Sequence, residues 1–199
     1  ITHAVIRTNT IDSLMIFSNK GKFYRLLVND IPVGTNVSQG TSVKSLINMD
    51  MDEQPAVMYS IYRDTDAKYV LFATKNGMVK KTSLEEYIST KKKTGIGAIN
   101  LKDGDSLVSV SLIKDEPIVF ITANGYMLKC NSSDISATSR MTCGVKGVNL
   151  GKDDYIVAAL PIRDPKDALA VFSEHGFGKK LAPEEMMTQK RGGKGIICF

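Results

Sequence analysis

Four segments of the chain share one pattern: an apolar run, a short polar turn that ends in glycine, and a second run that ends in basic residues. In the second copy, Asn76 and Gly77 separate two β-prone runs. This dipeptide predicts a hairpin whose two central turn residues both have positive φ. The turn glycines recur at intervals of 56, 48 and 51 residues, at Gly21, Gly77, Gly125 and Gly176. A strand–turn–strand core with a period of about 50 residues predicts a radial array of small sheets.

Each repeat is expected to contain four strands. In the second repeat, Pro55–Tyr62 forms the first strand, 69–73 and 78–82 form the hairpin, and Ala98–Leu101 forms the fourth. Loop glycines follow the turn glycines by 19, 20, 22 and 19 residues, at Gly40, Gly97, Gly147 and Gly195. The pattern predicts an all-β array of about four four-stranded blades in a single domain, 1–199, and it leaves open whether the ring closes. The repeats are expected at approximately 1–53, 54–105, 106–153 and 154–199.

Composition narrows the class of protein. A hydrophobic content of 43% suffices for a core, and 24% charged residues argue against disorder. The net charge of +5 permits a polyanionic partner. The three cysteines (130, 143 and 198) form no CxxC pair, as expected of reduced thiols in a cytoplasmic protein. No apolar run reaches the roughly 18 residues that span a bilayer. The chain begins without Met and ends inside an expected strand, which indicates a piece of a longer polypeptide.

No catalytic centre is predicted. His3 and His175 lie in different repeats. His175 fills a hairpin-turn position that Lys20, Asn76 and Asn124 fill in the other repeats. The chain lacks the nucleophile-elbow, P-loop, dinucleotide-binding and zinc-protease motifs. Acidic turns recur at 50–53, 103–105 and 153–154, but each has too few ligands for a calcium loop. We therefore expect these acidic residues to stabilise turns, and we expect no metal site.

Basic residues concentrate at the end of the third strand and in the loop that follows it. Lysine is common at exposed strand edges, where it blocks edge pairing. Equivalent positions in a radial array share one rim, however, and a track of separated cations suits the phosphates of a long polyanion. The chain has no tryptophan and no interleaved aromatic residues, which favours duplex over single-stranded nucleic acid. The expected DNA contacts are Lys80, Lys81, Lys91, Lys92, Lys93, Lys129, Lys146, Lys179, Lys180, Lys190, Arg191 and Lys194.

The densest cluster places three cations among three glycines. Glycine lets a backbone approach phosphate closely, and arginine can donate two parallel hydrogen bonds to it; a flexible turn with incidental charges is the alternative. The heptapeptide resembles the gyrase A box of the bacterial DNA gyrase A subunit, with lysine in place of the first arginine. Residues 73–82, 101–105 and 144–148 are also similar to the C-terminal domain of that protein. The box-like residues are Gln189, Lys190, Arg191, Gly192, Gly193, Lys194 and Gly195.

The resemblance implies a β-pinwheel, in which neighbouring blades exchange strands and duplex DNA bends around a basic rim. In gyrase, this wrapping serves the ATP-driven introduction of negative supercoils by a type IIA topoisomerase. The implied partners are double-stranded DNA, the gyrase B subunit, and the rest of the gyrase A subunit, in the bacterial cytoplasm and nucleoid, with no membrane. No cofactor is implied in this domain, since the ATP and Mg²⁺ sites and the active-site tyrosine of the family lie elsewhere.

Two features depart from the gyrase pattern. The box stands in the last repeat instead of the first blade, and there are fewer repeats than gyrase usually has. The C-terminal domain of the topoisomerase IV A subunit, which recognises DNA crossings in decatenation, is therefore an alternative. A propeller that binds other proteins is another. The well-formed heptapeptide favours gyrase.

Overall fold

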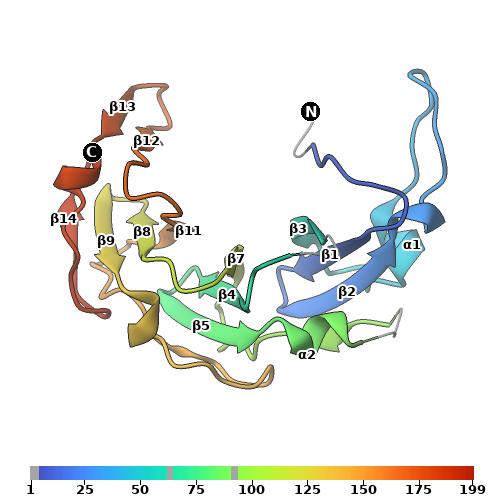
Figure 1. The fold of residues 1–199 in the computed structure, drawn as a ribbon, viewed down its shortest axis with the longest axis horizontal. Coiled ribbons are helices and arrows are strands. Elements are labelled where there is room, and N and C mark those ends of the chain that lie inside the picture. Colours follow the sequence, from blue (N-terminus) through green and yellow to red (C-terminus); the bar gives the residue numbers. More distant parts are fainter. Residues whose placement is uncertain (1–4, 62–64, 91–93) are drawn as a thin grey trace.

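The computed structural model describes residues 5–61, 65–90 and 94–199, which form an open arc of small antiparallel sheets (Figure 1). The prediction of an all-β blade array is confirmed. In the described residues, three sheets have four strands and the last has two. None of the described helices is long and apolar enough to cross a membrane. The helical turns are η1 (Val28–Asp30), α1 (Val43–Ile47), α2 (Glu85–Ile88), η2 (Ser132–Asp134) and η3 (Pro183–Glu185).

Each four-stranded sheet consists of one hairpin and two edge strands that the next repeat supplies. The first sheet has the order β3 (Pro55–Ile61), β1 (Ser13–Ser18), β2 (Lys22–Leu27), β6 (Ile96–Gly97). The second has the order β7 (Leu107–Ile113), β4 (Tyr69–Thr74), β5 (Met78–Ser83), β10 (Val145–Lys146). The third has the order β11 (Ile156–Pro161), β8 (Ile118–Thr122), β9 (Tyr126–Cys130), β14 (Ile196–Ile197). The last hairpin pairs β12 (Leu169–Phe172) with β13 (Gly178–Leu181).

This topology confirms the strand exchange that the resemblance implies. Strands β3 and β6 flank the hairpin β4–β5 in sequence, yet they pair with β1 and β2. The expected repeats are therefore units of sequence, and each sheet draws on two of them. The core lies between successive sheets, where Phe17 packs edge-on against Phe72 with ring centroids 5.4 Å apart. Burying this surface is what holds neighbouring sheets together.

The hairpin turns differ from the predicted type. Gly77 has a φ of +83°, but Asn76 is not in the left-handed region. Three residues separate β4 from β5, which matches a type I turn followed by a left-handed glycine. The Oγ1 of Thr74 accepts a hydrogen bond from the backbone N–H of Met78 at 3.2 Å. A hydroxyl residue makes the same bond in the other three hairpins, at Ser18, Thr122 and Ser173.

Two of the three glycines that precede the outer strands differ from the predicted loop glycines, and Gly195 is common to both sets. Strand β6 comprises Ile96–Gly97 instead of Ala98–Leu101. In that register, Gly95, Gly144 and Gly195 are equivalent, at 18, 19 and 19 residues after their turn glycines. A Cβ at Gly144 or Gly195 would lie within 3.0 Å of a backbone carbonyl in the neighbouring hairpin. Glycine is needed at these two positions because the backbone of the exchanged segment lies in direct contact with the backbone of the hairpin.

Candidate nucleic-acid interface

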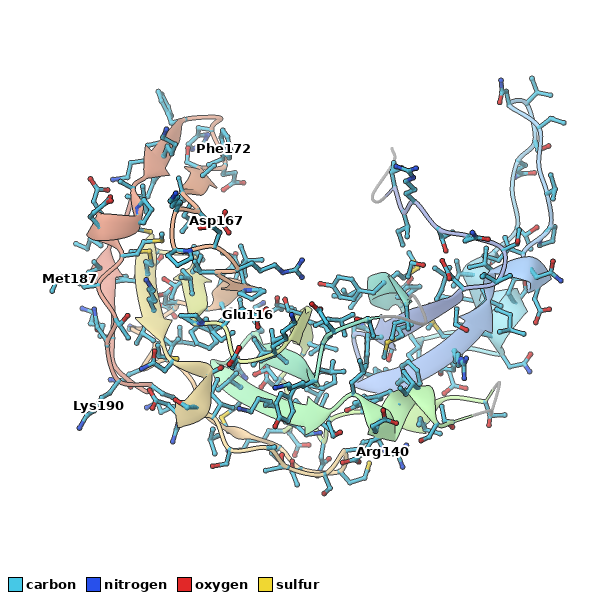
Figure 2. All side chains as sticks on the ribbon, viewed as in Figure 1. Glu116, Arg140, Asp167, Phe172, Met187 and Lys190 are labelled. Atoms are coloured by element: carbon cyan, nitrogen blue, oxygen red, sulfur yellow. The ribbon has the colours of Figure 1, made fainter. Side chains whose placement is uncertain are left out.

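The outer edge of the arc consists of β6, β10, β14 and the loops that lead into them. Two of these loops, 138–144 and 189–195, occupy equivalent positions, because each ends at the glycine before an outer strand. Figure 2 shows Arg140 and Lys190 on the outside of the arc, one from each loop. This edge therefore presents comparable loops from successive sheets.

The box-like loop lies against the preceding exchanged segment. The backbone N–H of Gln189 donates to the carbonyl of Lys129 at 2.7 Å, and that of Gly192 donates to the carbonyl of Gly147 at 2.7 Å. The carbonyl of Gly193 accepts from the N–H of Asn149 at 2.8 Å. Since the N–H of Gly192 is used within the protein, it is not among the groups that the loop presents outward.

Arg191 is bonded to the protein on two sides. Its Nε donates to the carbonyl oxygen of Asp134 at 2.9 Å, and its Nη1 donates to that of Lys146 at 2.7 Å. The side chain is half-buried. These two bonds join the loop to η2 and to β10, so the guanidinium holds the loop in place.

The two lysines of the loop are exposed. Lys194 extends over the ring of Tyr126, with its Nζ 4.7 Å from the ring centroid. Lys190 is exposed at the outside of the arc (Figure 2). Lys146, on the neighbouring outer strand, is exposed and donates to the Oδ1 of Asn149 at 2.6 Å. The structure thus places three expected DNA contacts on one edge, over two successive sheets.

The other expected contacts are distributed differently. Lys129 is half-buried on β9, and Lys179 and Lys180 are exposed on β13. Lys91, Lys92 and Lys93 lie outside the described residues. This edge also carries Arg140, which is not among the predicted contacts. Its Nε lies 3.7 Å from Oε2 of Glu86. The signal that identifies Arg140 is its spacing, because Arg140 and Arg191 each precede an outer-strand glycine by four residues.

Lys80 and Lys81 are buried, contrary to the expectation that they contact phosphate. Lys80 is 1% exposed and Lys81 is 8% exposed. Adjacent residues of a strand point to opposite faces of its sheet, and the middle sheet is covered by neighbours on both faces. Both side chains donate to backbone carbonyls of other segments of the protein.

Two of the acidic turns, 103–105 and 153–154, have the expected role in turn structure. The Oδ1 of Asp105 accepts from the N–H of Asn76 at 2.9 Å, which ties the inter-sheet turn to a hairpin turn. Asp154 makes the same bond to Asn124 at 3.0 Å. Within the described part of the chain, no group of three His, Cys, Asp or Glu side chains is placed to hold a metal ion.

A family model described as the DNA gyrase C-terminal domain, beta-propeller, matches residues 12–50, 68–114, 116–163 and 167–198. The chain belongs to this family. It is 32% identical to the DNA gyrase A protein of Lawsonia intracellularis over 98% of its own length. It covers 24% of that relative, so it spans about a quarter of the length of a whole gyrase A polypeptide.

Solved structures of the family have the same fold. The C-terminal domain of a DNA topoisomerase IV superimposes with a TM-score of 0.85 at 33% identity, covering 98% of this chain and 60% of that one. A DNA gyrase A C-terminal domain gives a TM-score of 0.78 at 28% identity, covering 94% and 60%. The predicted resemblance to the gyrase family is confirmed, and topoisomerase IV is a close neighbour.

Proposed function

We propose that this chain binds duplex DNA along the outer edge of the arc, bends it, and wraps DNA for negative supercoiling by a bacterial gyrase. The observation that carries the proposal is the position of Lys146, Lys190 and Lys194. These exposed lysines lie on the outer edge of two successive sheets. Ammonium groups spaced along a curved edge neutralise phosphates without reading bases, so binding is independent of sequence.

Bending requires contacts on more than one sheet. Curving a site of 20–30 base pairs by 40–90° costs on the order of 1–6 kcal/mol. A single cluster holds DNA without bending it. Lys146 and the loop 189–195 form one such cluster, because Arg191 donates to the carbonyl of Lys146 at 2.7 Å. Arg140, in the equivalent loop one sheet earlier, is the second point of contact. Arg140 and Arg191 add positive charge at equivalent positions of this edge.

The complete heptapeptide Gln189–Gly195 favours gyrase, and the TM-score of 0.85 keeps topoisomerase IV as the second candidate. In either case the partners are DNA, the B subunit, and the rest of the A subunit. ATP-driven strand passage takes place elsewhere in the enzyme. A gyrase that carries this domain is expected to supercoil relaxed plasmid in the presence of ATP. Decatenation without supercoiling would assign the domain to topoisomerase IV.

The DNA contact is tested by gel shift and ring closure of short duplexes across a salt series. Wild type is compared with the double variant Lys190→Ala/Lys194→Ala. The control, Lys102→Ala/Lys152→Ala, loses the same charge, and its two exposed lysines lie in the turns before β7 and β11. The loop variant is expected to lower the slope of log K against log salt by roughly 1.8, at about 0.9 for each phosphate contact. The control is expected to keep the wild-type slope.

Equal losses in both variants would show that overall charge, not the outer edge, governs binding. No DNA binding by wild type at any salt concentration would overturn the proposal and favour a protein-binding propeller.

A further inference from the structure

The middle sheet contains two neighbouring buried lysines that bond in opposite directions. Lys80 and Lys81 are consecutive in β5, so their side chains leave opposite faces of the sheet. Each ammonium donates to backbone carbonyls of other segments. We propose that Lys80 and Lys81 are positioning residues that set the angles between the middle sheet and its two neighbours, and thereby the curvature of the outer edge.

Lys81 connects the middle sheet to the third sheet. Its Nζ donates to the carbonyl oxygen of Ser132 at 2.9 Å. Ser132 begins η2, directly after β9 of the third sheet. The ammonium also lies 4.8 Å from the ring centroid of Tyr69. The carbonyl oxygen and the face of the ring both stabilise the ammonium electrostatically. Lys81 therefore has partners for its charge within the protein and does not depend on a phosphate.

Lys80 connects the middle sheet to the first sheet. Its Nζ donates to the carbonyl oxygen of Ala98 at 2.6 Å and to that of Arg140. The Ala98 backbone is fixed to the first hairpin, because its N–H donates to the carbonyl of Gly21 at 2.8 Å. Arg140 belongs to the loop that leads into β10. One ammonium thus joins the exchanged segment of the first sheet to the outer loop of the second.

Comparison of the repeats supports a role at sheet junctions. The position four residues after the turn glycine is basic in every repeat, at Arg25, Lys81, Lys129 and Lys180. Arg25 acts like Lys81: its Nη1 donates to the carbonyls of Ile88 and Thr90 at 3.0 and 3.2 Å. Those carbonyls follow the second hairpin, just as Ser132 follows the third. A basic residue therefore crosses both of these junctions.

The bonds are directional, and this matters more for geometry than for stability. Charge-assisted bonds to fixed carbonyls define where the neighbouring backbone lies. Methionine fills a similar volume without donating, so it removes the bonds while the packing around the aliphatic part of the side chain is kept. Loss of the bonds is therefore expected to loosen the arc without unfolding it. The charged or titratable groups acting on Lys80 are Glu86, Arg140 and Cys143.

The consequence for DNA rests on the proposed function. If these lysines act only on curvature, their removal reduces bending while the number of neutralised phosphates stays the same. If they contact phosphate directly, each removal lowers the salt slope by about 0.9. The two roles are therefore separable in one titration.

The test compares Lys80→Met and Lys81→Met with Lys152→Met, which replaces an exposed lysine in the turn before β11. Small-angle X-ray scattering of the DNA-free protein is expected to show a broader distance distribution for the first two variants only, with cooperative unfolding preserved. Ring closure of short duplexes is expected to fall in the same two variants at an unchanged salt slope. Lys81→Arg, which keeps a donor as Arg25 does, is expected to restore the wild-type scattering.

Wild-type scattering and ring closure in both methionine variants would overturn the proposal, as would a lowered salt slope with an unchanged arc. If Lys81→Met fails to fold, wild-type scattering by Lys80→Met and altered scattering by Lys81→Arg would overturn it. Since scattering needs no DNA, it decides the positioning role even if wild type does not bind DNA.

Discussion

Gly195 lies directly against the backbone of Met127, so closely that a Cβ on Gly195 would come within 3.0 Å of the Met127 carbonyl oxygen. Gly144 has the same relationship to Val79 one sheet earlier. The last glycine of the heptapeptide therefore seats an outer strand on the neighbouring hairpin. Glycine is required at this position by the fold itself, whether or not the loop contacts DNA.

Replacing Gly195 with alanine is expected to destabilise the fold more than the same change at Gly40. Both glycines have a left-handed φ, +83° and +80°, but a Cβ at Gly40 meets nothing within 4 Å. The left-handed conformation costs alanine about 1–2 kcal/mol at both sites. Overpacking against Met127 adds about 1–3 kcal/mol at Gly195 alone. Urea denaturation measures both, and equal losses would contradict the seating role.

Substitution of Arg191 is expected to lower stability, whereas substitution of Lys190 is expected to weaken DNA binding. Arg191→Lys loses one of two carbonyl bonds, which costs about 1 kcal/mol of unfolding free energy for a partly exposed group. Lys190→Ala is expected to change stability by less than about 0.5 kcal/mol and to lower the salt slope of DNA binding by about 0.9. Denaturant unfolding and salt titration of both variants check this. A larger stability loss for Lys190→Ala would refute the assignment.

Lys80 makes stability depend on pH in a predictable direction. Burial lowers the pKa of Lys80 to about 8, whereas in the unfolded chain the pKa returns to 10.5. Between these values the unfolded state binds more protons, so the free energy of unfolding rises with pH. The limit for one proton is about 1.4 kcal/mol per pH unit. Urea denaturation from pH 7 to 10.5 is expected to show this rise in wild type relative to Lys80→Met; parallel curves would contradict it.

Asp105 is expected to stabilise a hairpin turn through one oxygen. Its Oδ1 accepts the N–H groups of Asn76 and Ser106 at 2.9 and 2.8 Å. Asp105→Ala is expected to cost about 1 kcal/mol, and Asp105→Asn less, since asparagine retains the acceptor. Asp103→Ala, in the exposed part of the same turn, is the control. Thermal unfolding compares the three, and the idea fails if the two alanine variants are equally destabilised.

The hairpins could be predicted because their signals are local. A turn glycine such as Gly77 and the apolar runs beside it specify a hairpin wherever it lies in the fold. The pairing of edge strands could not be predicted from the repeat alone, since β3 has the same apolar pattern whether it pairs with β1 or β4. Only the resemblance to a family indicated the exchange.

The misplaced glycines and lysines have physical explanations. Gly97 and Gly147 recur at a similar spacing, but close contact selects a different set. Neighbouring backbone requires glycine at Gly144 and Gly195, and the Tyr24 ring requires it at Gly95. A count of spacings cannot distinguish the two sets. The sequence already excluded the prediction that Lys80 and Lys81 both contact DNA, because consecutive strand residues point to opposite faces and cannot share one rim. Whether each side chain is buried depends on the neighbouring sheets, and the structure shows that both are buried. The exposed lysines of the heptapeptide were predictable because glycine-rich loops lie at surfaces.

Strand exchange also determines when each sheet can form during synthesis. The first hairpin is complete at Leu27, but its outer strand ends at Gly97, 70 residues later. At ribosomal rates of roughly 5–20 residues per second, the hairpin waits on the order of 4–14 s with an unpaired edge. Such an edge can pair with other nascent chains. The yield of folded protein therefore depends on how quickly each hairpin receives strands from the repeat that follows it.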